Sequence, residues 1–355
     1  MTQFVDWDLA ISTAGTISKA GPRVSFDEAA EVVGDLRQLT DEAASHVIAT
    51  SGLGSAAGAA PAGHPPVRVV DRADWAAANL RGLRDVMTPL MERALAGRVP
   101  GAFAQQVGSR LTGVQAGTVL GYLSGKVLGQ YEVFSGEPGN LLLVAPNIVE
   151  VERKLGAPPR DFRLWVCLHE VTHRTQFTAV PWLRQYFLDQ VGEFVDASRA
   201  DTEQLADRLR HAMESLADAV RSPDSRSSVL DLVQTPAQRE VVDRLTALMT
   251  LLEGHADYIM DAVGPQVVPS VEEIRSKFNR RRETTNPVER VIRKLLGIDA
   301  KMRQYAEGNK FVTALVDRVG MDGFNQVWES AETLPRLAEI TDPDAWLRRV
   351  HGTEI

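Results

Sequence analysis

Three residues of one short segment have the types and spacing of a catalytic metal site. His169 and His173 are four residues apart, and Glu170 directly follows the first histidine. On a helix, two residues four apart lie about 40° apart around the axis, so both imidazoles can reach one ion. Glu170, about 100° further round, can face the open coordination position and take a proton from a zinc-bound water, whose pKa falls to about 7. The pattern predicts a zinc site with Glu170 as general base.

The local context favours a helix that holds these side chains rigid. Five apolar residues, Leu164 to Leu168, precede the motif and would bury that helix. The alternative is an exposed helix on which the two histidines are paired by chance.

A catalytic zinc usually has three protein ligands and one open position, so a third donor is required. Glu253 lies on a second apolar run that starts near Val241, and Asp257 follows it by four residues. Glu253 can therefore bind the ion while Asp257 orients a ligand histidine by accepting its other ring N–H. Taken alone, this spacing is also typical of a surface or capping pair.

His255 competes with Glu253 as the third ligand, because imidazole is a good zinc donor. On a helix it lies about 200° from Glu253, so both cannot easily face one ion. If Glu253 is the ligand, His255 either packs elsewhere or reaches the rim of the site as a catalytic donor to the transition state. Cys167 is opposed to His169 in the same way, and we expect it to be a buried apolar filler. Tyr258 and Tyr305 could donate to an oxyanion, but a tyrosine near a core is more often structural.

Most of the chain has the periodicity of amphipathic helices. Apolar residues recur every three or four positions over Phe26–Ala49, Trp75–Ala96 and Asp201–Arg221, and a further helix is expected over about Ile148–Leu155. Asp71 or Asp74 can cap the second of these helices. The expected fold class is mainly α (α+β), with extra helices around a small sheet.

The clearest strand signal runs from Gln130 to Val144, with a Gly/Pro turn in its middle, and predicts a small hairpin. We expect its second strand, Asn140–Val144, to be able to pair with an extended substrate. Upstream, Gly117, Gly121, Gly125 and Gly129 recur every four residues and predict a helix packed closely on a neighbour.

Composition excludes several classes of protein. The net charge is −8, which argues against a nucleic-acid partner, and the basic run Arg275–Arg282 is typical of a solvated helix face. No stretch is apolar enough to span a membrane. A single cysteine and the absence of a visible secretory signal favour a cytoplasmic location.

The stretch from Ser51 to Pro66, rich in Gly, Ala and Pro, is the one segment typical of a linker. We therefore expect a helical N-terminal segment with its linker over residues 1–66 and a catalytic body over residues 67–355.

These residues together resemble a known group of enzymes. The motif at His169–His173 followed by Glu253 and Asp257 is similar to that of gluzincins, a branch of the zincin-like metallopeptidases. The chain looks closer still to an actinobacterial zincin-like family associated with deazaflavin-coenzyme biosynthesis. The stretches that carry this likeness are His169–Arg184, Glu253–Gly264, Leu295–Gly308 and Asp342–Val350.

The resemblance implies a mainly helical zincin-like core, zinc held by His169, His173 and Glu253, and Glu170 as the base. In one respect the chain departs from thermolysin-like enzymes, because the stretch between His173 and Glu253 is much longer. The resemblance therefore implies an insertion there, and it leaves the shape of the substrate cleft open.

The first functional hypothesis is a zinc metallopeptidase that acts on a peptide or protein substrate. The second is a catalytically silent zinc-binding scaffold, for which a fully ligated ion would be expected. A third is a zinc hydrolase of small non-peptide amides. The sequence predicts neither the substrate nor the oligomeric state.

Overall fold

The structure is a computed structural model that describes residues 4–54, 67–94, 102–136, 138–197, 235–283 and 298–352. Side chains are not described for 93–94, 102–106, 278–283 and 298–306. The elements in chain order are α1 (Trp7–Ile17), α2 (Phe26–Ser51), β1 (Arg68–Val70), α3 (Arg72–Ala94), α4 (Ala102–Leu123), β2 (Gly129–Glu132), β3 (Asn140–Val144), α5 (Ala145–Leu155), α6 (Pro159–Ala179), α7 (Leu183–Ala197), α10 (Pro236–Val263), α11 (Val271–Glu283), α13 (Ile298–Phe324), the 3₁₀ turn η1 (Asn325–Trp328), α14 (Leu337–Ile340) and α15 (Pro343–His351).

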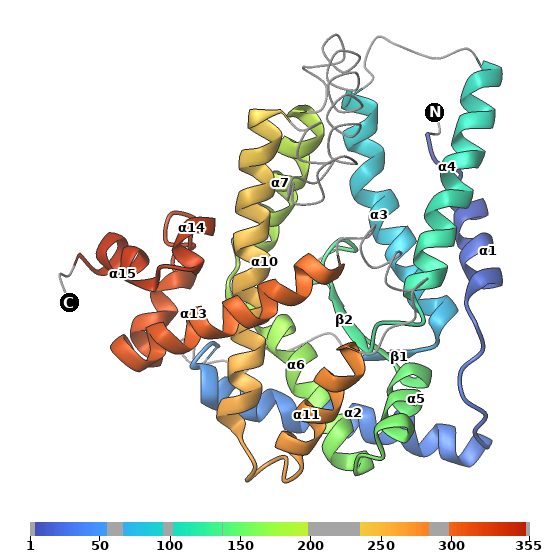
Figure 1. Cartoon of the computed structure of the whole chain (residues 1–355). Coiled ribbons are helices and arrows are strands. Elements are labelled where there is room, and N and C mark those ends of the chain that lie inside the picture. Colours follow the sequence, from blue (N-terminus) through green and yellow to red (C-terminus); the bar gives the residue numbers. More distant parts are fainter. Residues whose placement is uncertain are drawn as a thin grey trace, which may run out of the picture.

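Helix α6 and the sheet lie between two groups of helices (Figure 1). α1, α3 and α4 lie on one side, α13, α14 and α15 lie on the other, and the long helix α10 runs past α6. The predicted mainly helical fold with a small sheet is confirmed. None of the helices in the described ranges is long and apolar enough to cross a membrane.

Helix α6 is buried along most of its length because its sequence is apolar on several faces at once. Pro159 occupies the first turn, where the missing N–H costs nothing. All five residues from Leu164 to Leu168 are buried. Cys167 is completely buried against α2, where Thr40 Oγ1 donates to its Sγ, and burial raises the pKa of its thiol to about 12. It therefore fills the core, as expected.

Within the described residues, the sheet has three strands in the order β1-β3-β2. The predicted hairpin is confirmed, since β2 pairs antiparallel with β3 and sets Gln130 opposite Leu142. β1 pairs with β3 in parallel on the other side. β3 is therefore the central strand, and the expectation that Asn140–Val144 offers an edge to a substrate is wrong, because both of its edges are already paired. β2 is the edge strand on the side of the sheet opposite β1.

Burial on both faces explains the sequence of β3. Leu141 and Leu143 join the core formed with α2 and α6, whereas Leu142 and Val144 pack with α1 and α3. A strand covered on both faces is apolar at every position, so it lacks the usual alternation.

The four glycines that recur every four residues, from Gly117 to Gly129, do not all lie on one helix. Gly117 and Gly121 lie on α4 against the backbone of α1, where an added Cβ would be 2.3 Å from Ala10 O and 2.9 Å from Ala14 O. Close packing on a neighbouring helix is thus confirmed for these two. α4 ends at Leu123, however, so Gly125 lies in a turn and Gly129 begins β2. The prediction that all four share one helix is wrong.

Other predicted boundaries agree with the structure or lie outside it. α2, α3 and α5 correspond to three of the four expected helices, and Asp71 Oδ1 accepts from Asp74 N at the start of α3. The expected helix Asp201–Arg221 lies outside the described residues, as does the linker beyond residue 54. The division at residue 66 stays a prediction.

Candidate metal centre

Three side chains from two helices meet at one point. His169 and His173 come from α6 and Glu253 comes from α10. The two Nε2 atoms are 3.2 Å apart, and Glu253 Oε2 lies 3.4 Å from that of His169 and 3.5 Å from that of His173. Among the described residues, no other group of His, Cys, Asp and Glu side chains is close enough to share an ion.

These separations suit a tetrahedral zinc ion. Bonds of about 2.0–2.1 Å in tetrahedral geometry set the ligand atoms about 3.3 Å apart. All three observed separations between ligand atoms lie close to that value. Hydrogen bonding alone would not require the three separations to be equal. Two imidazoles and one carboxylate are also a donor set that zinc favours. The residues therefore fit the ion in both geometry and chemistry.

The two histidine side chains of this cluster are partly exposed. The side chains of His169 and His173 are 22% and 14% exposed, while Glu253 is 9% exposed. Three converging donors, with no fourth His, Cys, Asp or Glu ligand among the described residues, match a catalytic zinc site, whereas structural sites are closed by a fourth protein ligand.

Glu170 lies against the first residue of the edge strand. It is buried, and a Cβ added to Gly129 would lie 2.7 Å from its Cγ and 3.0 Å from its Oε1. Only a residue without a side chain leaves room for the carboxyl group here. β2 therefore helps to set the position of the candidate base.

We expect Gly129→Ala to displace Glu170 without removing the zinc ligands. Because displacing a catalytic group by about 1 Å can cost about 10²-fold in rate, hydrolysis by the zinc-loaded chain should fall at least tenfold while zinc content stays unchanged. Gly125→Ala is the matched control, since its added Cβ has no neighbour nearer than Tyr122 O at 3.8 Å. Parent-level hydrolysis in Gly129→Ala would show that Glu170 has no role in the reaction or tolerates the shift.

Comparison with known proteins agrees with this geometry. The chain matches the zincin-like metallopeptidase family over residues 5–347. It belongs to that family. A solved structure from Chloroflexus aurantiacus, described as a "putative hydrolase with a novel fold", is 29% identical and superposes with a TM-score of 0.68, covering 98% of this chain and 99% of that one. A search among curated proteins finds no match.

Neither the family match nor the similar structure mentions deazaflavin-coenzyme biosynthesis. For this member of the zincin-like metallopeptidases, that association stays a prediction.

The charges at the centre are strongly coupled. Burial by itself lowers the pKa of His173, but the adjacent Glu253 carboxylate, together with smaller contributions from Glu170 and Gln176, outweighs this effect and raises the pKa to about 9. Burial in turn raises the pKa of Glu253, and the two histidines reverse that effect and hold the pKa well below its ordinary value. The carboxylate is therefore ionised, as a zinc ligand must be.

His255 does not reach the rim of the site. It is completely buried, with its ring 5.4 Å from that of Phe324 and 5.5 Å from that of Trp328. Burial, together with the charge of His173, lowers its pKa to about 3. With no exposed surface, the ring cannot touch a substrate, so the predicted catalytic role is not supported by the structure. The helical geometry that opposes it to Glu253 sends it into the core instead.

Asp257 does not orient a ligand histidine either. Its carboxylate faces Arg275 at 3.9 Å, and Arg275 also binds Asp261 at 2.8 Å. This ion pairing means that part of the basic run is engaged within the molecule. Tyr258 lies partly buried between two core clusters, and the side chain of Tyr305 is outside the described set.

The contact expected of Asp257 is made by a residue that the sequence analysis missed. Gln176 Oε1 lies 3.0 Å from Nδ1 of His173. Its position three residues after His173 could have indicated this contact from the sequence, because residues three apart share one helix face.

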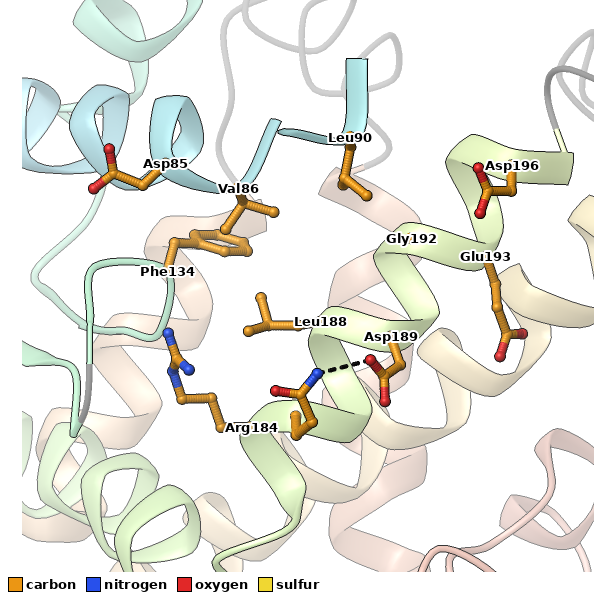
Figure 2. A pocket seen from close by; sticks show the side chains of 11 residues that line it. Asp85, Val86, Leu90, Phe134, Arg184, Leu188, Asp189, Gly192, Glu193 and Asp196 are labelled. Atoms are coloured by element: carbon orange, nitrogen blue, oxygen red, sulfur yellow. Dashed lines mark hydrogen bonds between the residues drawn. The ribbon is translucent and has the colours of Figure 1, made fainter. Parts of the chain in front are cut away.

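A pocket of about 500 Å³ opens between α3, α7 and the segment after β2 (Figure 2). Apolar side chains meet inside it and carboxylates surround them. Its lining consists of Asp85, Val86, Leu90, Phe134, Arg184, Gln185, Leu188, Asp189, Gly192, Glu193 and Asp196. None of these residues is a candidate zinc ligand. Arg184 Nε donates to Val133 O and ties α7 to the end of β2.

Proposed function

We propose that this chain is a zinc-dependent hydrolase that cleaves peptide bonds, with His169, His173 and Glu253 as ligands and Glu170 as general base. The observation that carries the proposal is the cluster of three donors at zinc-like separations, with no fourth protein ligand among the described residues. Membership of the zincin-like metallopeptidases and similarity to a protein described as a hydrolase support it.

A zinc ion at this centre would lower the pKa of water and polarise the scissile carbonyl. The residues of the chain then move the proton. Glu170 takes it from the attacking water and returns it to the leaving amine, which is the role of a general base that later acts as an acid. Burial of Glu170 against Gly129 keeps the carboxyl group in one place for both transfers.

A peptide suits the surroundings better than a small amide. β2 is the edge strand, and its Gly129 end touches Glu170. Two residues past its other end, Phe134 lines the pocket. At about 3.3 Å per residue, the three steps along β2 from Gly129 to Glu132 extend roughly 10 Å, which is room for about three residues of an extended substrate beside the strand.

The proposal is tested first by metal content. The purified chain should hold one zinc. Glu253→Ala should bind zinc at least about 100-fold more weakly, because losing a ligand lowers affinity more than the 10–100-fold loss typical of removing a residue that hydrogen-bonds to a ligand. Mass spectrometry of the metal and chelator competition measure both quantities. Glu240→Ala, an exposed residue of the same helix, should bind zinc as the parent does.

Parent protein that takes up no zinc after loading would refute the proposal and make the paired histidines accidental. A parent that holds zinc and cleaves no member of a broad peptide library would point instead to a zinc-binding scaffold or, if small amides are cleaved, to an amidohydrolase.

A further inference from the structure

The side-chain amide of Gln176 is completely buried between the two helices that bear the candidate ligands. Its Oε1 lies 3.0 Å from His173 Nδ1. Its Nε2 lies 3.0 Å from Leu252 O and 3.0 Å from His255 Nδ1. The two sides of one amide thus contact a candidate ligand on α6 and the residue before the candidate ligand on α10.

Counting donors and acceptors fixes the direction of each bond. Leu252 O is a carbonyl and can only accept, so the group facing it must be the amide N–H of Gln176. The amide oxygen then faces His173, and an oxygen can only accept, so His173 must carry a proton on Nδ1. In the zinc-binding form this leaves the lone pair on Nε2, the atom that points toward His169 and Glu253.

His255 reinforces this orientation of the amide. Its Nδ1 accepts the second N–H of Gln176, so its own proton lies on Nε2. Turning the amide over would place the oxygen against Leu252 O and against a nitrogen lone pair, and it would leave buried N–H groups facing His173. Each lost or repulsive contact in a buried site is costly, because no water replaces the missing partner.

We propose that Gln176 is a positioning residue for the metal centre, which holds His173 in the tautomer that presents Nε2 to the ion and ties α6 to α10 beside Glu253. This inference rests on the zinc site of the proposed function but not on hydrolysis. Outer partners of ligand histidines normally act in this way, and their loss typically weakens metal binding 10–100-fold.

Two substitutions separate positioning from packing. Gln176→Met keeps the size of the side chain and removes both hydrogen-bonding ends, so zinc affinity should fall 10–100-fold. Gln176→Glu keeps an oxygen that accepts from His173 Nδ1, so zinc affinity should stay within a factor of about three, although losing the contact with Leu252 O lowers the thermal midpoint of the zinc-free chain. Gln38→Met, at an exposed position of α2, should change neither quantity.

Chelator competition on the full-length chain gives the affinities, and nitrogen NMR of the histidine rings gives the tautomer. In the zinc-loaded parent, His173 should be bound through Nε2 and protonated on Nδ1. Equal affinities of the parent and Gln176→Met would overturn the proposal, as would equal losses in Gln176→Met and Gln176→Glu that follow their thermal midpoints.

If Gln176→Met does not fold, the parent spectrum decides, and coordination through Nδ1 overturns the proposal. A parent that binds no zinc would instead refute the proposed function itself.

Discussion

Replacing Glu170 by glutamine is expected to lower peptide hydrolysis by about 10²–10⁴-fold, the usual contribution of a general acid–base group, while one zinc per chain remains bound. Glutamine has nearly the same shape as glutamate, so the contact with Gly129 is preserved. It cannot accept the proton of the attacking water, and both proton transfers are lost together. The measurement is the rate at which new amino termini form in a peptide library treated with zinc-loaded protein, beside the zinc content of the same sample.

The control for this prediction is Glu28→Gln on α2, which alters an exposed ion pair with Arg153 and should leave the rate unchanged. Two outcomes would contradict the assignment. If Glu170→Gln cleaves at the parental rate, another group is the base. If the variant loses its zinc along with its activity, the Glu170 carboxylate contributes to binding the ion, and its role as base is not demonstrated.

The local part of the metal centre could be predicted from the sequence because helical geometry alone determines it. Positions four apart on one helix share a face whatever surrounds them, so the convergence of His169 with His173 follows from spacing. Glu253 could be proposed on the weaker ground that a third donor was needed. Its approach to the histidines depends on how α10 packs on α6, which no spacing along the chain specifies.

The residues around the ligands were harder to predict for the same reason. Asp257 is one turn from Glu253 and seemed a suitable partner for a histidine, but packing brings it to Arg275 instead. Gln176 takes the histidine contact because α6 itself supplies a neighbour three residues away. His255 has the chemistry of a catalytic residue, and only the burial of its ring between Phe324 and Trp328 excludes direct contact with substrate.

The sheet shows a similar limit. The turn residues predicted the hairpin of β2 and β3, which is a local feature. The short strand β1 pairs with β3 from a distant part of the sequence and decides which strand is at the edge. Gly129, the last of the four regularly spaced glycines, had the right spacing for a helix. In the structure it begins β2, and the absence of a side chain there leaves room for Glu170.

Gly254→Ala is expected to destabilise the chain by about 3 kcal/mol or more, the upper range for overpacking a core, and to weaken zinc binding with it. α10 and α13 touch backbone to backbone at this point. A Cβ on Gly254 would lie 2.1 Å from Gly308 C, and one on Gly308 would lie 2.2 Å from Thr250 O. The overlapping atoms are backbone, so the helices must separate. Replacing glycine in a helix normally gains about 1 kcal/mol, which is smaller than this cost.

Gly34→Ala gives the matched comparison, because Gly34 is exposed within α2 and an added Cβ there meets nothing within 4 Å. That variant should gain about 0.4–1 kcal/mol, so the two substitutions should move the denaturant midpoint in opposite directions. Gly254 also directly follows the candidate ligand Glu253, and separating α10 from α13 shifts the backbone that holds its carboxylate. If Gly254→Ala unfolds at the parental midpoint and keeps the parental zinc affinity, the close crossing of α10 and α13 is not what fixes the third ligand.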